Sequence, residues 1–134
     1  MTSRPVPVAD LLVTLAEPTR LRIVSCLSAA PLFVSDLATI LELADTAISE
    51  HLDTLETLGI VRTYPVAPYV LYALAPLPGS RDRLLRSVLD AMRTDAAAQA
   101  DRAAALDRSR SRFETRVRGA RTAGGGGGAV MNAS

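Results

Sequence analysis

The chain has 134 residues, enough for one domain, and 49% of them are hydrophobic, while the scarcity of aromatics (4%) favours packed helices over a large sheet. Residues 1–80 carry four arginines and eight acids, a net charge of −4, whereas residues 81–121 carry eleven arginines and six acids, a net charge of +5. No apolar run reaches the roughly 20 residues that span a bilayer, and the first ten residues lack a signal-peptide core. We therefore expect a cytoplasmic protein without a membrane partner.

Two helices are predicted at the start of the chain. Leu11 and Leu12 belong to an apolar stripe at helical spacing over residues 8–15. A second helix starts at Pro18, since proline is tolerated in a first helical turn. It carries Cys26, the only cysteine of the chain, which excludes an intrachain disulfide and favours a buried structural thiol over a reactive one.

Residues 34–58 have the pattern of a helix-turn-helix. Ser35 with Asp36 is predicted to cap a short helix over residues 34–41. After a tight turn, a second helix over residues 45–58 directs four apolar residues inward and ends at Gly59, a residue typical of helix C-termini.

The second half of the chain begins with a predicted β-hairpin, formed by residues 60–64 and 69–74 around a proline-bounded tip. Ser80 is then predicted to cap one long helix that extends towards Leu106. After Arg108 the helical spacing degrades, and we expect disorder from about Gly119 onward. The pattern predicts a mainly α fold with a small β-hairpin, a winged helix-turn-helix over residues 1–107, followed by an Arg-rich and then Gly-rich flexible tail over residues 108–134.

Three stretches of the chain carry motifs at the spacing of a known family. Residues 17–24, EPTRLRIV, are similar to an opening motif D-P-T-R-x-x-I-L. Residues 48–61, ISEHLDTLETLGIV, match a recognition-helix pattern V-S-x-H-L-x-x-L-x-x-x-G-L-V, and the hairpin ends in YAL where Y-Y-x-L is common. Together they resemble the ArsR/SmtB family of winged-helix transcriptional regulators over roughly residues 8–95. The resemblance implies regulation of transcription by binding to double-stranded DNA.

The resemblance also implies a homodimer formed through the first and last helices, which act as N- and C-terminal dimerisation helices. The predicted interface is a set of apolar residues on those helices: Leu11, Leu12, Leu84, Leu85, Val88, Leu89 and Met92. The alternative is that this stripe only packs against the core of its own chain. A long terminal helix with little sheet to cover favours the contact between subunits.

The metal-binding residues of the family are missing from this sequence. Its thiolate site requires cysteines on the third helix, because soft metals prefer thiolate, and Phe33 and Ser35 occupy those positions. Its other site requires histidine on the final helices, whereas the only histidine, His51, lies on the recognition helix. We therefore predict neither a metal nor a cofactor. The chain also lacks a phosphate-binding Gly loop and any Ser-His-acid arrangement, so we predict that it is not an enzyme.

The predicted recognition helix has the wrong charge for DNA, which is a polyanion. Its solvent-facing positions, where family members often carry Gln, Arg or Lys, are largely acidic, and residues 45–74 carry four acids against one arginine. Cations would then have to come from Arg4, Arg20, Arg22, Arg62 and the Arg-rich segment after Arg108. The predicted DNA contacts form a mixed set: Asp45, Thr46, Ser49, Glu50, His51, Thr54 and Arg62.

Two interpretations of this helix remain open. In the first, the protein binds DNA, the acids lie on a solvated flank, and one acid accepts a hydrogen bond from cytosine. In the second, DNA affinity is largely lost, and the domain is a dimerisation or interaction module that binds another protein through the acidic helix or the Arg-rich tail. Residues 108–121 hold six arginines and one acid, which suits nucleic acid, an acidic partner, neutralisation of the protein's own acidic dimer, or a solvated tail without function.

Overall fold

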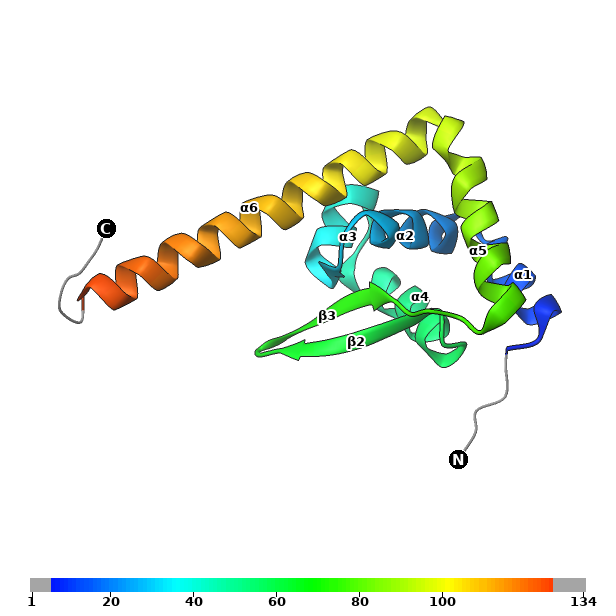
Figure 1. The fold of residues 1–134 in the computed structure, drawn as a ribbon, viewed down its shortest axis with the longest axis horizontal. Helices are drawn as coiled ribbons and strands as arrows, with labels where there is room; N and C mark the ends of the chain where they lie inside the picture. Colours follow the sequence, from blue (N-terminus) through cyan, green and yellow to red (C-terminus); the bar gives the residue numbers. More distant parts are fainter. Residues whose placement is uncertain (1–5, 127–134) are drawn as a thin grey trace.

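The helices and strands of the computed structural model, which describes residues 6–126, follow the predicted order with two additions (Figure 1). A short strand precedes the helix-turn-helix, and the last helix is divided in two. The elements are α1 (Val8–Leu15), α2 (Pro18–Ala29), β1 (Leu32–Phe33), α3 (Val34–Leu41), α4 (Asp45–Thr57), β2 (Val61–Val66), β3 (Tyr69–Leu74), α5 (Gly79–Ala91), a 3-10 turn η1 (Met92–Thr94) and α6 (Ala96–Gly126).

The predicted hairpin is confirmed and belongs to a three-stranded antiparallel sheet in the order β1-β3-β2. Strands β2 and β3 pair over their whole length, from Val61 opposite Leu74 to Val66 opposite Tyr69. Strand β1 adds two residues on the other side of β3, with Leu32 opposite Tyr72. Sequence analysis did not predict β1, because two residues are too short for the alternation of apolar and polar side chains that identifies a strand.

The core lies where α1, α2, α3 and α4 meet the base of the sheet. Leu11, Ile23, Leu37, Ile48 and Leu52 are all fully buried there. Each of these side chains contributes roughly 1.5–3 kcal/mol through its removal from water. The core is therefore largely aliphatic, and it fixes α3 and α4 relative to each other.

Helix α3 spans the predicted residues, and one of the two residues predicted to cap its first turn does so. Ser35 is exposed, while Asp36 is fully buried. The Asp36 carboxylate accepts a hydrogen bond from the Phe33 amide at 2.9 Å, and this amide precedes the helix. Asp36 therefore caps the helix as predicted, reaching back from the third helical position, whereas Ser35 makes no capping hydrogen bond with the described residues.

The single long helix predicted from Ser80 to Leu106 is also wrong, because the chain turns sharply after α5 (Figure 1). Asp95 has an extended backbone, with φ −87° and ψ 117°, and separates η1 from α6. The turn directs α6 back along α2, where Ala98, Asp101 and Ala105 are buried. Their spacing places them on one helical face, and their small size allows the two helices to approach closely.

Helix α6 also continues through the region expected to be a flexible tail. It crosses residue 107 without interruption and reaches Gly126, so the helix continues past Arg108, where the spacing predicted that helical order degrades. The flexibility of the segment stays a prediction. The rest of the predicted tail, residues 127–134, lies outside the described residues. Among the described helices, none is both long and apolar enough to cross a membrane.

We predict that the contact between α6 and α2 has no room for a larger side chain. Ala105→Leu places a bulky group at a fully buried position, and overpacking of this kind costs about 1–3 kcal/mol of stability. Urea denaturation followed by circular dichroism measures the loss. The matched control is Ala103→Leu, an exposed position on the same helix, which should leave the stability nearly unchanged. Equal stability of the two variants would contradict the close packing of α6.

Candidate nucleic-acid interface

The turn between α3 and α4 sets the angle of the helix-turn-helix. Glu42 adopts a left-handed backbone conformation, with φ 59° and ψ 48°, and ends α3. The Leu43 amide then donates to the Ala38 carbonyl at 3.1 Å, which closes the last turn of the helix. Helix α4 begins two residues later at Asp45, so the connection is short and its geometry is fixed by backbone hydrogen bonds.

Helix α4 is held by its inward face and ends as predicted at Gly59. Ile48, Leu52 and Leu55 are fully buried on the inward face. Gly59 has φ +78°, a conformation that favours glycine, and the Ile60 amide donates to the Leu55 carbonyl at 2.9 Å. The chain then enters β2 directly, so the outward face of α4 and the β2–β3 wing lie at fixed positions relative to each other.

The structure places the predicted DNA-contacting residues on this outward face and on the wing. Three of the six on α4 are exposed, namely Asp45, Thr46 and Glu50, and three are half-buried, namely Ser49, His51 and Thr54. The Thr54 hydroxyl donates to the Glu50 carbonyl at 3.2 Å, so its proton is already used within the helix. The seventh residue, Arg62, is exposed on β2.

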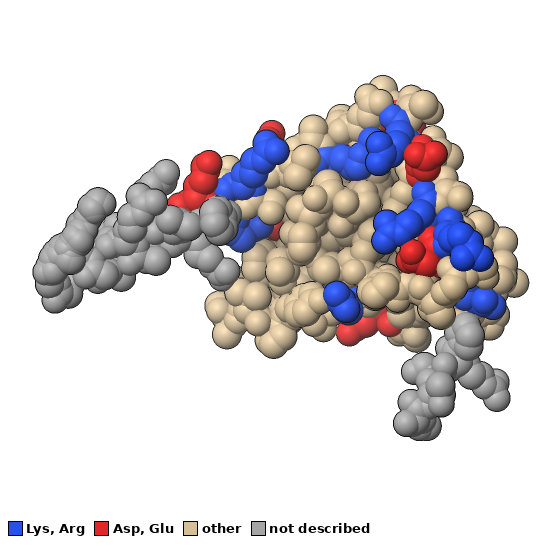
Figure 2. Space-filling model, in the orientation of Figure 1, with Lys and Arg blue, Asp and Glu red and all other residues tan. Residues whose placement is uncertain are grey.

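The acids of α4 are exposed and face solvent. Glu50, Asp53 and Glu56 make no salt bridge with any side chain that the structure describes. Two of these acids affect Tyr72 of β3. Burial raises the pKa of Tyr72, and the negative charges of Glu56 and Asp53 raise it further. In Figure 2, a small acidic patch shows at the lower edge, near where Figure 1 places α4, whereas basic side chains are more numerous over α5 and α6.

The wing is apolar and aromatic rather than basic. Tyr64, Tyr69 and Val70 are 41%, 66% and 42% exposed. The Arg62 guanidinium lies over the Tyr64 ring, 5.4 Å from its centroid, a separation typical of a cation–π contact. Arg62 therefore contributes a positive charge on β2, while the tip beyond it offers apolar surface.

Two arginines of the Arg-rich segment are bound to the helix-turn-helix itself. The Arg108 Nε donates to the Asp36 Oδ1 at 2.8 Å, and Arg112 donates to the same oxygen. The Arg112 guanidinium also lies 4.7 Å from the centroid of the Phe33 ring. With the bond from the Phe33 amide, these contacts satisfy a carboxylate that is fully buried at the start of α3. We call this set, Phe33, Asp36, Arg108 and Arg112, the Asp36 clamp.

The clamp determines the protonation of its carboxylate. Burial by itself raises the pKa of Asp36, but the hydrogen bonds from Arg112, the Phe33 amide and Arg108 together outweigh burial and lower it below the ordinary carboxyl value. Asp36 is therefore ionised at neutral pH. Sequence analysis missed the clamp, although the spacing of four between Arg108 and Arg112, which places both on one face of a helix, was a readable signal.

Two of the other cations proposed for DNA contacts are also engaged within the chain. The Arg22 guanidinium forms two hydrogen bonds with the Asp101 carboxylate of α6, at 2.9 and 3.0 Å. The Arg20 Nε donates to the Thr14 carbonyl at 2.8 Å. Arg4 lies outside the described residues.

Known bacterial regulators share this geometry. A family profile described as "Bacterial regulatory protein, arsR family" matches residues 17–63, from α2 to β2. The transcriptional repressor SmtB homolog of Synechocystis sp. is 36% identical over 67 residues, which make up 50% of this chain and 51% of that protein. This chain thus aligns with about half the length of that relative.

Two solved structures show the same architecture. HlyU from Vibrio cholerae N16961 is 30% identical with a TM-score of 0.55, over 62% of this chain and 88% of that one. A homodimeric winged helix-turn-helix DNA-binding domain from Mycobacterium bovis, a possible ArsR-family regulator, is 27% identical with a TM-score of 0.54, over 63% of this chain and 76% of that one. The chain belongs to the arsR family.

Not all of the residues predicted for a dimer interface are exposed in this arsR-family chain. Leu11 is fully buried and Leu85 is 3% exposed, so both belong to the core of the protomer, and their assignment to a dimer interface is corrected. Leu84, Val88, Leu89 and Met92 are half-buried. Leu12 is exposed, and it has two exposed neighbours on α1 that sequence analysis did not select, Val8 and Val13.

The two positions that were compared with the thiolate ligands of the family lie at the start of the helix-turn-helix. Phe33 is buried in β1 and Ser35 is exposed on α3. Among the described residues, no group of three or more His, Cys, Asp or Glu side chains could hold a metal ion. Cys26 is fully buried, and burial together with the nearby Asp101 raises its pKa to about 12, so its thiol stays protonated at neutral pH.

We predict that the Asp36 clamp stabilises the fold in a pH-dependent way. Because the pKa of Asp36 is lower in the folded than in the unfolded chain, the clamp contributes stability above the unfolded pKa, and this is lost as the pH falls through the folded pKa. Asp36→Asn should therefore lower the free energy of unfolding by about 3 kcal/mol at pH 7. Its deficit relative to wild type should shrink below a pH of about 4.

Urea denaturation at pH 7 and pH 3 measures this difference. The control is Asp53→Asn, which removes an exposed carboxylate that makes no salt bridge with the described side chains, and which should change the stability little at either pH. A deficit for Asp36→Asn that is the same at both pH values would show that the charge of Asp36 is not what the clamp requires.

Proposed function

We propose that this protein is a DNA-binding transcriptional regulator that acts as a homodimer, with α4 as the recognition helix and β2–β3 as the wing. The observation that carries the proposal is the rigid presentation of α4. Its inner face is locked in the core, its ends are fixed by Glu42 and Gly59, and its outer face presents Thr46, Ser49 and His51. A helix held in this way is the part of a helix-turn-helix that enters the major groove.

The negative charge of α4 determines whether DNA binding depends mainly on phosphate contacts or on base contacts. Lys and Arg contacts to phosphates supply most of the affinity that does not depend on sequence, and α4 offers carboxylates instead. Hydroxyl and imidazole groups still form hydrogen bonds with base edges, and a carboxylate such as Glu50 accepts from the cytosine amino group. We therefore infer low affinity for arbitrary DNA and a dependence on base contacts.

A second function, binding of another protein through α4, is favoured by the contacts of the arginines. Arg22, Arg108 and Arg112 are all paired with carboxylates of their own chain, so they do not act as free cations for a duplex. The exposed acids of α4 and the apolar wing would then form a surface for a basic partner with apolar groups. Absence of DNA binding would favour this second function.

The proposed regulator does not use a thiolate metal site. Phe33 and Ser35 support this inference, because neither side chain provides the thiolate that soft metals select. We also propose that the winged-helix unit extends beyond residue 107 to at least Arg112, since the Asp36 clamp joins this part of α6 to α3.

The dimer proposal gives a test on α1. Val8, Leu12 and Val13 are 42%, 47% and 70% exposed, which is a large apolar surface for an isolated protomer. Leu12→Glu with Val13→Glu should convert a dimer into a folded monomer, because neither side chain belongs to the core. Light scattering after gel filtration at micromolar concentration measures the mass, with Leu43→Glu, another exposed apolar position, as the control. A monomeric wild type would contradict the proposal.

The DNA proposal gives a test on the acids of α4. Glu50→Arg and Asp53→Lys each remove a repulsive charge and add a cation that can neutralise a phosphate, so both should tighten binding to any duplex. The dependence of affinity on salt should steepen by about one unit for each additional phosphate that is neutralised. Fluorescence anisotropy on the protein's own upstream DNA and on an unrelated duplex, at two salt concentrations, measures both effects.

The control for this test is Asp107→Arg, which makes the same change of charge at an exposed position on α6. If Glu50 accepts from a cytosine, Glu50→Arg should weaken binding to the upstream DNA by about 1–3 kcal/mol while binding to the unrelated duplex tightens. Failure of the wild type to bind its upstream DNA even at low salt would sink the DNA proposal.

A further inference from the structure

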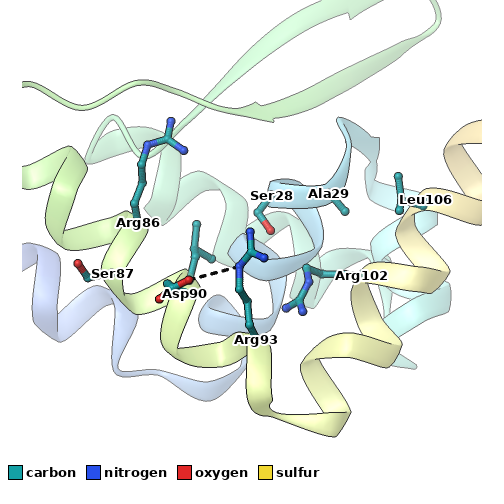
Figure 3. A pocket seen from close by; sticks show the side chains of 9 residues that line it. Ser28, Ala29, Arg86, Ser87, Asp90, Arg93, Arg102 and Leu106 are labelled. Atoms are coloured by element: carbon teal, nitrogen blue, oxygen red, sulfur yellow. Dashed lines mark ion pairs between the residues drawn. The ribbon is translucent and has the colours of Figure 1, made fainter.

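A groove with a volume of about 740 Å³ lies between the C-terminal end of α2, the outer side of α5 and the first turns of α6 (Figure 3). This volume falls within the roughly 300–1,000 Å³ typical of small-molecule sites. The groove is remote from the outward face of α4, and neither the helix-turn-helix nor the wing contributes a residue to it.

The walls of the groove are positively charged. Arg86, Arg93 and Arg102 line it from three successive elements, α5, η1 and α6, and only one carboxylate, Asp90, lines it with them. Figure 3 shows the guanidinium groups of Arg93 and Arg102 close to each other beside Ser28, with the side chain of Asp90 next to Arg93, whereas the Arg86 guanidinium points away from them. Three arginines and one carboxylate give the groove a net positive charge, so it attracts an anion.

The guanidinium groups are available to a ligand. Arg93 pairs with Asp90 at 3.4 Å and Arg86 pairs with Asp82 at 2.9 Å, and in both pairs the arginine side chain is about three-quarters exposed (75% and 73%), so the pairs are weak. Arg102 forms no salt bridge with any side chain that the structure describes. Its Nη1 donates only to the Ser25 hydroxyl, at 3.4 Å.

The remaining lining limits the kind of anion. Ala29, Leu89 and Leu106 contribute apolar surface, and Leu106 is 37% exposed. A hydrocarbon group would cover this surface. Asp90 repels a doubly charged phosphate more than a singly charged carboxylate, since the repulsion grows with the product of the charges. A carboxylate also matches the planar fork of a guanidinium.

We propose that this groove binds a small organic carboxylate, with its acid group at Arg102 and Arg93 and its hydrocarbon body on Ala29, Leu89 and Leu106. The bound acid bridges η1 and α6 and so fixes the angle between α5 and α6. Because α6 contacts α3 through the Asp36 clamp, occupancy of the groove would change the setting of the helix-turn-helix. This last consequence rests on the proposed function, whereas the binding itself does not.

Calorimetric titration of the full chain, without DNA, tests the site. Octanoate is the probe, and octan-1-ol and inorganic phosphate are the comparison ligands, which carry the hydrocarbon body and the charge separately. Octanoate should saturate one site per chain, and both comparison ligands should bind at least about tenfold more weakly. No saturable binding of octanoate, or equal binding of octan-1-ol or of phosphate, would overturn the proposal.

Two variants locate the site. Arg102→Gln and Arg93→Gln should each weaken octanoate binding about tenfold, since a hydrogen bond to a charged group is lost. Arg93 is 75% exposed, so its variant should fold even if removal of Arg102 disturbs α6. The matched control is Arg83→Gln, an exposed position on α5 outside the groove, which should leave the affinity unchanged. An equal loss in the control would show diffuse attraction to a basic surface and overturn the assignment.

Discussion

A single buried carboxylate, that of Asp36, determines how the two parts of this molecule fit together. An ionised group without access to water requires charged partners, and the Phe33 amide alone does not supply them. The partners come from α6, more than seventy residues further along the chain, as Arg108 and Arg112. The path of α6 over α2 is therefore tied to the start of α3. Through the short turn at Glu42, it is also tied to the orientation of α4.

The sequence predicted those elements whose apolar residues follow a regular period. Helices α1 to α4 and the hairpin belong to this group, and Gly59 correctly marks the end of α4. The start of α6 as a separate helix and its extension past Leu106 were missed because its inward stripe consists of small and charged residues, which a search for apolar periodicity does not detect. These residues are Ala98, Asp101, Ala105, Arg108 and Arg112. The same limit applies to the dimer surface, because spacing alone does not distinguish Leu11, buried in the protomer, from its exposed neighbour Leu12.

The distribution of charge along the chain explains why the exposed acids of α4 have no basic partners among the described residues. The chain carries more arginines than acids, but the excess lies in residues 81–121. Two of these arginines, Arg108 and Arg112, form ion pairs with Asp36 of α3. In the opposite direction, Arg22 of the acidic half forms an ion pair with Asp101 of α6. The ion pairs thus cross between the two halves of the chain and hold them together. They leave most of the basic side chains visible in Figure 2 over α5 and α6.

The break at residues 92–95 has a consequence for how two chains can combine. Helix α6 is joined to α5 only by this exposed link, and its principal contacts are with α2 and α3, including those of Asp101 with Arg22 and of Arg108 with Asp36. A second copy presents an identical α2 and α3. If the link straightens, α6 continues the axis of α5 and packs against α2 and α3 of the other copy. The α6 of that copy packs against this one in the same way, so the two chains exchange this helix, which is a domain swap. The side chains that hold α6 on α2 and α3 in this protomer would then join an intertwined pair, with those contacts preserved and only the chain that supplies α6 changed.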